Sequence, residues 1–331
     1  TATSAALNVA IGNESLRLTN TGGSNTAVGR ESGYSGTTHS GSVYIGEQAG
    51  YSVTTGNQNI AIGHDAMNGA TTTGDNNIAV GSQQTLDALT SGFLNIAIGG
   101  KAGSAINTGN TNTVIGFQSG LSLTTASGSV AIGTSAMAIA TTGNNNIAIG
   151  NAAANGGNTT GDNNISIGTT AGDALTSGHT NIFIGKNAGV DLTTGIQNIA
   201  IGEAALDAAD GAEDYNIAIG QNSLGTLNND GAQYNVAIGA DSVTGGTAEL
   251  LGVVAIGQVA GQSINSADAN YTVAVGYAAL RNNTSGIGNV AVGYNALLSE
   301  DDGDRNTAVG YEALKDQTGV SGTVSNTAVG Y

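Results

Sequence analysis

A five-residue pattern of hydrophobic and polar positions recurs along the whole chain, for example at residues 59–63, where the sequence is Asn-Ile-Ala-Ile-Gly. Nineteen copies end in a glycine, and these glycines follow one another at intervals of 17 to 20 residues, from Gly12 to Gly330. The residue before the glycine is always Ile or Val, and the residue three before it is always Ile, Val or Thr. β-Branched residues favour strands, and a spacing of two places them on one side of a strand. Each copy is therefore predicted to be a short strand that buries its two β-branched side chains.

The residue between these two is Ala in fifteen copies, the exceptions being Tyr44, Val114, Ser166 and Phe183. A strand side that faced only water would carry larger polar residues. The repeated Ala therefore indicates that another layer of backbone comes close to it. Burying two or three side chains per repeat stabilises less than the ordering of about 17 residues costs. We expect the Ala side to pack against a partner chain, in a homo-oligomer.

A third buried residue is expected in some repeats at Leu206, Leu224, Leu280, Leu297 and Leu314.

Polar and flexible residues mark the remaining positions of the repeat. Four residues before the glycine stands Asn in fifteen of nineteen copies, and identical amides stacked from repeat to repeat can form a hydrogen-bonded ladder. The ladder is predicted to include Asn59, Asn77, Asn95, Asn146 and Asn164. The glycine suits a bend with positive φ, as predicted at Gly63, Gly81, Gly99, Gly150 and Gly202. A second short strand is expected about three residues later, followed by a turn rich in Thr, Gly, Asn and Asp.

A repeat of 17 residues is too short for a strand, a packed helix and a return, and no segment has the spacing of a helix. The sequence therefore predicts an all-β fold, a parallel β-solenoid of about 19 coils, each of 17–20 residues. Residues 1–331 are predicted to form one continuous repeat domain. Its coils are regular over 1–205, whereas over 206–331 the turns are longer and more acidic and several coils contain Tyr. At a strand spacing of about 4.8 Å the solenoid would be roughly 90 Å long.

Composition narrows the class of function. The chain has 24 acidic and 7 basic residues and a net charge of −17, which is the wrong sign for a nucleic-acid-binding protein. It has no Cys, which excludes disulfides and thiolate metal sites, and no Pro, which suits strands paired on both sides. No run of 18 apolar residues predicts a membrane-inserted segment. Because neither end of the sequence has a polar capping repeat, we expect the parent polypeptide or its assembly to continue beyond both ends.

Two sequence segments resemble known fibre repeats. The run Ser129-Val130-Ala131-Ile132-Gly133 resembles the YadA-like head repeats of trimeric autotransporter adhesins. The run 306–314, Asn-Thr-Ala-Val-Gly-Tyr-Glu-Ala-Leu, is similar to repeats of phage tail fibres. The resemblance implies a left-handed parallel β-roll with three chains around one axis, on a cell or virion surface. It also implies that the inner core contains Ile60, Ile62, Ile96, Ile98, Ile147, Ile149, Ile199 and Ile201. The adhesin repeat is usually about fourteen residues long, so the longer repeat here leaves the trimer geometry open.

Few residues are candidates for binding or catalysis. The acidic run Glu300, Asp301, Asp302 and Asp304 is a weak calcium candidate, and a solvated charged turn is the favoured interpretation. The histidines, His39, His64 and His179, fall at unrelated repeat positions and predict no metal or catalytic cluster. Tyrosines recur in register at Tyr277, Tyr294 and Tyr311, where coil-upon-coil packing is favoured over sugar stacking. No nucleophile has a matching base, so the sequence predicts neither an enzyme nor a cofactor.

We therefore expect an extracellular structural and adhesive protein, the shaft or head of a surface fibre, which associates with itself and binds a host-surface glycan or protein receptor. An alternative is a filament subunit that stacks end to end through uncapped solenoid ends. A minor alternative is an ice-binding solenoid. It would use threonine pairs such as Thr54-Thr55, Thr124-Thr125, Thr141-Thr142 and Thr193-Thr194.

Overall fold

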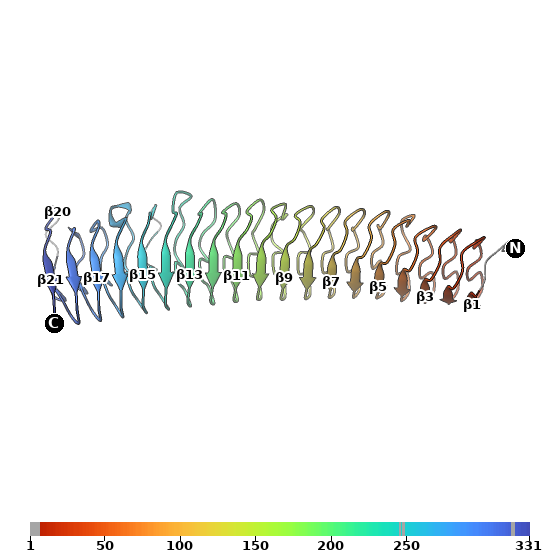
Figure 1. Ribbon diagram of the computed structural model, residues 1–331, viewed down its shortest axis with the longest axis horizontal. Helices are drawn as coiled ribbons and strands as arrows, with labels where there is room; N and C mark the ends of the chain where they lie inside the picture. The colour runs from red at the N-terminus through yellow and green to blue at the C-terminus, as the bar shows by residue number, and fades with distance from the viewer. Residues whose placement is uncertain (1–6, 245, 247–248, 319–321) are drawn as a thin grey trace. The chain divides into compact units, whose positions relative to one another are not determined.

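The computed structural model describes residues 7–244, 246, 249–318 and 322–331, and these residues are organised as two compact units, Thr1–Asn163 and Asn164–Tyr331. Within the described residues the chain is all-β and contains no α-helix, only the 3₁₀ turn η1 (Ala267–Ala269). In each unit one strand follows another with a turn between them (Figure 1). The predicted change near residue 206 falls inside the second unit, and the single continuous domain stays a prediction.

Unit 1 contains nine three-residue strands. They are β1 (Val9–Ile11), β2 (Thr26–Val28), β3 (Val43–Ile45), β4 (Ile60–Ile62), β5 (Ile78–Val80), β6 (Ile96–Ile98), β7 (Thr113–Ile115), β8 (Val130–Ile132) and β9 (Ile147–Ile149).

Unit 2 contains ten strands of the same kind and one further short pair. The ten are β10 (Ile165–Ile167), β11 (Ile182–Ile184), β12 (Ile199–Ile201), β13 (Ile217–Ile219), β14 (Val236–Ile238), β15 (Val254–Ile256), β16 (Val273–Val275), β17 (Val290–Val292), β19 (Thr307–Val309) and β21 (Thr327–Val329). The short pair is β18 (Gly303–Asp304) with β20 (Gly322–Thr323).

Consecutive strands within each unit pair in parallel, and they pair in the register of the repeat. In β4 and β5, for example, Ile60 lies opposite Ile78 and Ala61 opposite Ala79. Equivalent residues of successive repeats therefore form columns along each unit. This is the arrangement of a parallel β-solenoid, with about nineteen turns in the two units together, and the predicted fold class is confirmed.

The strands face the opposite way from the prediction. The central Ala of nearly every strand is fully buried, as in Ala61 and Ala97, whereas the flanking β-branched residues are half-buried or exposed. The predicted core residues that the structure instead places on the outer side of the sheet are Ile60, Ile62, Ile96, Ile98, Ile147, Ile149, Ile199 and Ile201. The layer of backbone that approaches the Ala side belongs to the same chain. The predicted packing of that side against a partner is therefore wrong.

The interior is narrow, and this explains why small residues point into it. Where Phe183 replaces the central Ala, the residues beside it are Gly172 and Gly189, at which a Cβ would lie 2.7 Å and 2.5 Å from the Phe ring. Tyr44 has the same relation to Gly33 and Gly50. A larger inward side chain is thus accommodated only where glycines make room for it, as expected of an interior packed at close to crystalline density.

The predicted additional core leucines are confirmed. Leu206, Leu224, Leu280 and Leu297 are fully buried, and Leu314 packs partly buried against the same cluster. Each follows the Ala or Ser that stands three residues after the bend glycine. These leucines add volume to the core of unit 2, where most strands contribute only the methyl group of Ala.

The asparagine ladder is also confirmed. Asn95 accepts the backbone N–H of Asn112 at its Oδ1 (3.0 Å), and its Nδ2 donates to the carbonyl of Gly109 (2.8 Å). The same pair of bonds links Asn59 to Asn77 and Gly74. Each buried amide thus satisfies a backbone donor and a backbone acceptor in the following turn, groups that would otherwise be buried without partners. The predicted ladder residues Asn59, Asn77, Asn95, Asn146 and Asn164 are all buried.

The glycine after each strand bends the chain at positive φ, as predicted at Gly63, Gly81, Gly99, Gly150 and Gly202. At Gly99, with φ of +127°, an added Cβ would also lie 2.7 Å from the carbonyl oxygen of Gly116 in the next turn. Both the backbone conformation and the close approach of the next turn therefore require glycine there.

The segment after the bend is not the second strand that the sequence predicted. It forms a series of turns in which every second residue is left-handed, for example Asp65 (φ 59°) and Met67 (φ 54°). Its amides still bond between turns, since Asp65 donates to Glu47 in the preceding turn and Met67 donates to Thr85 in the following one. Alternation of left- and right-handed residues brings the chain back across the narrow interior in few residues.

We predict that Asn95→Ala destabilises the protein by about 2–3 kcal/mol, because it leaves the buried N–H of Asn112 and the buried carbonyl of Gly109 without partners. The measurement is the denaturation midpoint in urea. Asn151→Ala, at an exposed asparagine in unit 1, is the control and is expected to change the midpoint little. Equal effects of the two substitutions would show that the ladder does not stabilise the fold.

The core of unit 1 also contains a buried histidine. His39 is fully buried, and neither ring nitrogen has a hydrogen-bond partner among the described residues. Its ring lies 5.5 Å from the ring of Tyr44 and covers Gly36, whose Cβ, if present, would come within 1.7 Å of it. Burial lowers the pKa of His39 from 6.5 to about 4. The neutral ring therefore fills the interior at pH 7.

We predict that folding stability falls as the pH is lowered from about 6.5 to about 4. In this range the unfolded chain binds a proton at His39 and the folded chain does not, a difference of about 3 kcal/mol. Urea midpoints at the two ends of the range test this. His39→Phe should remove part of the pH dependence, whereas His179→Phe, which changes an exposed histidine, should keep it. An unchanged pH dependence in His39→Phe would contradict the prediction.

Candidate functional site

The most extensive surface feature is the outer side of the sheet, called here the outer sheet face: the residues one and three positions before each bend glycine. These positions contain only Ile, Val and Thr in all nineteen repeats. Ile98 is 39% exposed, Ile184 36% and Ile256 37%, each on the outer side of its strand. A solvated sheet face would carry polar residues at these positions. In each unit the outer sheet face is therefore an apolar strip without charges that follows the stacked strands.

Tyrosines stack in register at the edge of the outer sheet face in unit 2. The rings of Tyr277, Tyr294, Tyr311 and Tyr331 follow one another at 5.0–5.4 Å, with interplanar angles of 9–12°. The ring faces therefore contact one another along the solenoid, which confirms the predicted coil-upon-coil packing. Because these faces are occupied, a sugar can reach the edges and hydroxyl groups of the rings more readily than their faces.

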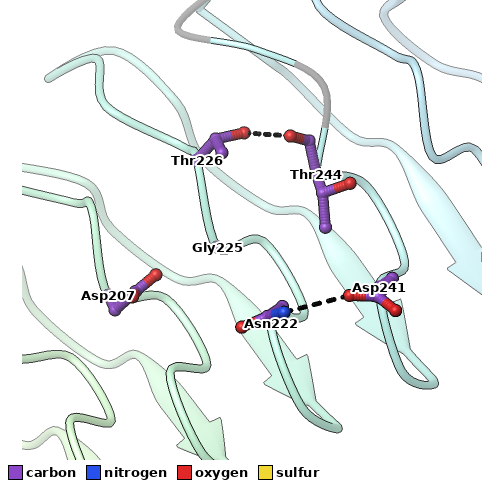
Figure 2. Close-up of a pocket in the computed structure, with 6 residues that line it drawn as sticks. All are labelled: Asp207, Asn222, Gly225, Thr226, Asp241 and Thr244. Atoms are coloured by element: carbon purple, nitrogen blue, oxygen red, sulfur yellow. Dashed lines mark hydrogen bonds between the residues drawn. The ribbon is translucent and has the colours of Figure 1, made fainter.

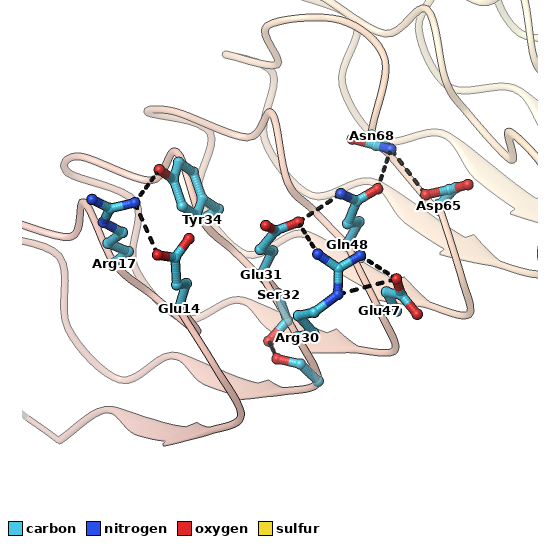
Figure 3. Close-up of polar contacts among 11 residues, drawn as sticks. Glu14, Arg17, Arg30, Glu31, Ser32, Tyr34, Glu47, Gln48, Asp65 and Asn68 are labelled. Atoms are coloured by element: carbon cyan, nitrogen blue, oxygen red, sulfur yellow. Dashed lines mark hydrogen bonds and ion pairs between the residues drawn. The ribbon is translucent and has the colours of Figure 1, made fainter.

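Exposed ion pairs follow the bends of the first turns of unit 1 (Figure 3). Arg30 pairs with Glu31 at 3.1 Å and with Glu47 in the next turn. The bond to Arg30 lowers the pKa of Glu47, and the bond to Glu47 raises that of Arg30. Both side chains are solvent-exposed, and exposed pairs contribute little to stability. This network therefore fixes the orientation of surface side chains but does not define a site.

The four predicted calcium ligands are brought together only in part. Carboxylate oxygens of Glu300, Asp301 and Asp302 lie within 4.8 Å of one another, whereas Asp304 accepts the backbone N–H of Ile287. Glu300 is fully buried, and its oxygens accept hydrogen bonds from two backbone amides and from the side-chain amides of two other residues. Burial and the neighbouring carboxylates raise the pKa of Asp302. The buried carboxylate of Glu300 thus already accepts hydrogen bonds from the protein, including two from backbone amides of its own turn.

A second acidic group lies in the longer acidic turns after residue 206 and contains Asp210, Glu213 and Asp230. Glu213 is fully buried, and its carboxylate accepts the N–H of Gly211 (3.0 Å) and of Asn229 (2.8 Å). Burial raises the pKa of Glu213. In both groups the buried glutamate bonds to backbone amides of the longer turns, which explains why those turns are acidic.

The remaining predicted candidates are separate from one another. His64 pairs with Asp65 on the surface, and His179 contacts Thr180, so the histidines form no cluster with the buried His39. The first threonine of several pairs donates its hydroxyl to the next turn, as Thr54 does to Thr72 (3.3 Å) and Thr124 to Thr141 (3.2 Å). These hydroxyls therefore take part in holding successive turns together.

A hollow of about 260 Å³ in unit 2, which none of the sequence motifs predicted, opens between three successive turns (Figure 2). It is lined by Asp207, Asn222, Gly225, Thr226, Asp241 and Thr244. Among the described residues the lining contains two carboxylates, one amide and two hydroxyl groups, and no large apolar side chain. It is polar enough to bind a hydroxyl-rich or charged small molecule.

Comparison with known proteins does not assign the chain to a family. A scan against protein-family models found no match, and neither did a search of curated proteins. Across the described residues, no helix has the length and hydrophobicity needed to cross a membrane.

Proposed function

We propose that the chain is part of an extracellular adhesive fibre, a shaft or head with a structural and non-catalytic role, in which copies of the chain associate through their outer sheet faces. The observation that supports this proposal is the uncharged strip of half-exposed Ile, Val and Thr side chains along each unit. Contiguous apolar surface of this kind marks interaction sites in soluble proteins.

The size of the strip suits a stable interface. With two such residues on each of its nine strands, unit 1 alone presents eighteen of them. A stable protein interface uses about 20–30 residues from each partner. A second copy is the occupant that fits best, because its own outer sheet face has the same regular spacing and the same lack of charge. A cyclic assembly of three copies around one axis would bring their outer sheet faces together and remove apolar surface from water.

Two further features agree with a surface fibre. The chain has a net charge of −17, and none of its charged residues occupies a position of the outer sheet face. The negative charge on the remaining surface would keep assembled particles soluble and apart. The likeness of the repeats to those of trimeric adhesins and phage tail fibres favours three chains in a left-handed arrangement and a glycan or protein receptor on a host surface. The adhesive role rests on that likeness.

The proposal predicts a particle of three times 32.2 kDa in solution, measured by light scattering. Ile98→Glu combined with Ile149→Glu places two charges on the outer sheet face of unit 1 and is expected to shift the particle towards the mass of one chain, because each buried unpaired charge costs several kcal/mol. Circular dichroism would verify that the separated chains keep their strands.

Ile139→Glu is the matched control, since Ile139 is 46% exposed but lies in a turn after β8. It should leave the trimer intact. A stable monomer of the unchanged chain would overturn the proposal. Particles that lengthen with protein concentration would favour the end-to-end filament instead.

A further inference from the structure

One register position on the turn side of the solenoid lacks a side chain in a single repeat. This position, five residues after the bend glycine, is occupied by Tyr34, Tyr51 and Asp207 in their repeats, and Gly225 is the only glycine there in the sequence. Since β12, β13 and β14 pair in register, Gly225 lies between the turns that carry Asp207 and Thr244. The missing side chain therefore leaves the hollow between two polar neighbours (Figure 2).

The width of this gap matches one ring. Neighbouring strands are about 4.8 Å apart, so side chains two turns apart are separated by about 10 Å, which leaves room for a ring in contact with both. The same column shows the spacing in unit 1, where the rings of Tyr34 and Tyr51 stack at 4.8 Å with an interplanar angle of 9°. A six-membered ring can thus take the place of the side chain missing at Gly225.

The groups around the hollow are mainly hydrogen-bond acceptors. Asn222 donates from Nδ2 to Oδ1 of Asp241 (3.0 Å), which leaves the amide oxygen and the second carboxylate oxygen available to a ligand. The hydroxyl of Thr226 donates a hydrogen bond to the backbone carbonyl of Thr244, and this bond links the two turns on one side of the hollow (Figure 2). Asp207 is half-buried on the opposite side, and burial raises its pKa. A ligand that offers several hydroxyl donors matches these acceptors.

We propose that the hollow at Gly225 binds one pyranose ring of a glycan, whose hydroxyl groups donate to Asp207, Asp241 and Asn222. This inference rests on the adhesive part of the proposed function and deepens it by assigning the contact with a glycan to the turns of β12–β14. A volume of about 260 Å³ accommodates a single sugar residue. The site is open on one side, so the rest of a glycan chain can extend into solvent. Such a shallow site gives a Kd on the order of 1 mM for one sugar.

The test is saturation-transfer difference NMR of the assembled protein with methyl glycosides of glucose, galactose, mannose and N-acetylglucosamine, each as a separate probe. We expect transfer to at least one sugar. Gly225→Asn restores a side chain to the column and should abolish it. Gly225 does not have positive φ, and the three heavy atoms nearest to an added Cβ are backbone atoms of Asn222 in its own turn, at 3.0–3.3 Å, so the variant is expected to fold with a small local shift.

Asp207→Asn keeps the shape of the hollow and should weaken binding about tenfold, the effect of losing one hydrogen bond to a charged group. Asp173→Asn, at the same register position two turns before Asp207, is the matched control and should bind like the unchanged protein. Absence of transfer to all four sugars, or transfer that survives in both Gly225→Asn and Asp207→Asn, would overturn the proposal.

Two further measurements distinguish a glycan site from a cation site and from the proposed assembly. Calorimetric binding of calcium chloride that is lost in Asp207→Asn, with no sugar binding, would make the hollow a cation site and overturn the proposal. Particle mass is measured on the same samples. A trimer that binds no sugar overturns only the glycan site, whereas a monomer that binds sugar through Gly225 and Asp207 upholds the site and overturns the proposed assembly.

Discussion

The stacking of successive turns at one hydrogen-bonding distance is the constraint on which the rest of the structure depends. Each three-residue strand pairs in parallel and in register with that of the next repeat within its unit, so equivalent residues form columns. Buried amides such as Asn95 extend this pairing through the turn before the strand, because they bond to the backbone of the next turn. A substitution in one turn therefore changes the contacts of the two neighbouring turns, whereas the contacts of distant turns are unaffected, as in other repeat proteins.

The same stacking makes the interior narrow and leaves the larger apolar residues outside. A turn of 17 residues encloses so little space that most strands contribute Ala. A large residue in the middle of a strand is matched by nearby glycines, as Gly172 and Gly189 are for Phe183. The Ile and Val residues then lie on the outer sheet face. This apolar strip gives the proposed assembly its driving force, because an assembly that covers it removes apolar surface from water.

Departures from the repeat give single turns surfaces and contacts that the regular turns lack. Where the column position at Gly225 loses its side chain, a polar hollow opens, and where turns lengthen, Glu213 and Glu300 enter the interior to bond backbone amides. Stacked tyrosines occur in both units, as Tyr34 with Tyr51 in unit 1 and Tyr294 with Tyr311 in unit 2. Exposed ion pairs also occur in both, as Arg30 with Glu31 and Lys186 with Glu203. A regular scaffold can thus carry different surfaces without a change in fold.

The sequence by itself determined the class of fold, the strands, the bends and the asparagine ladder, because a fixed period, a β-branched spacing of two and an invariant glycine each have a local physical meaning. It did not determine which side of the strand is inside. Ile60 and Ile62 share one side and Ala61 the other, but hydrophobicity favours burying the larger pair, and only the width of the folded turn rules this out. The segment with Asp65 and Met67 was likewise predicted as a strand, since its left-handed residues carry no glycine signal. The hollow at Gly225 depends on which turns lie next to each other, so it was decided by the tertiary structure alone.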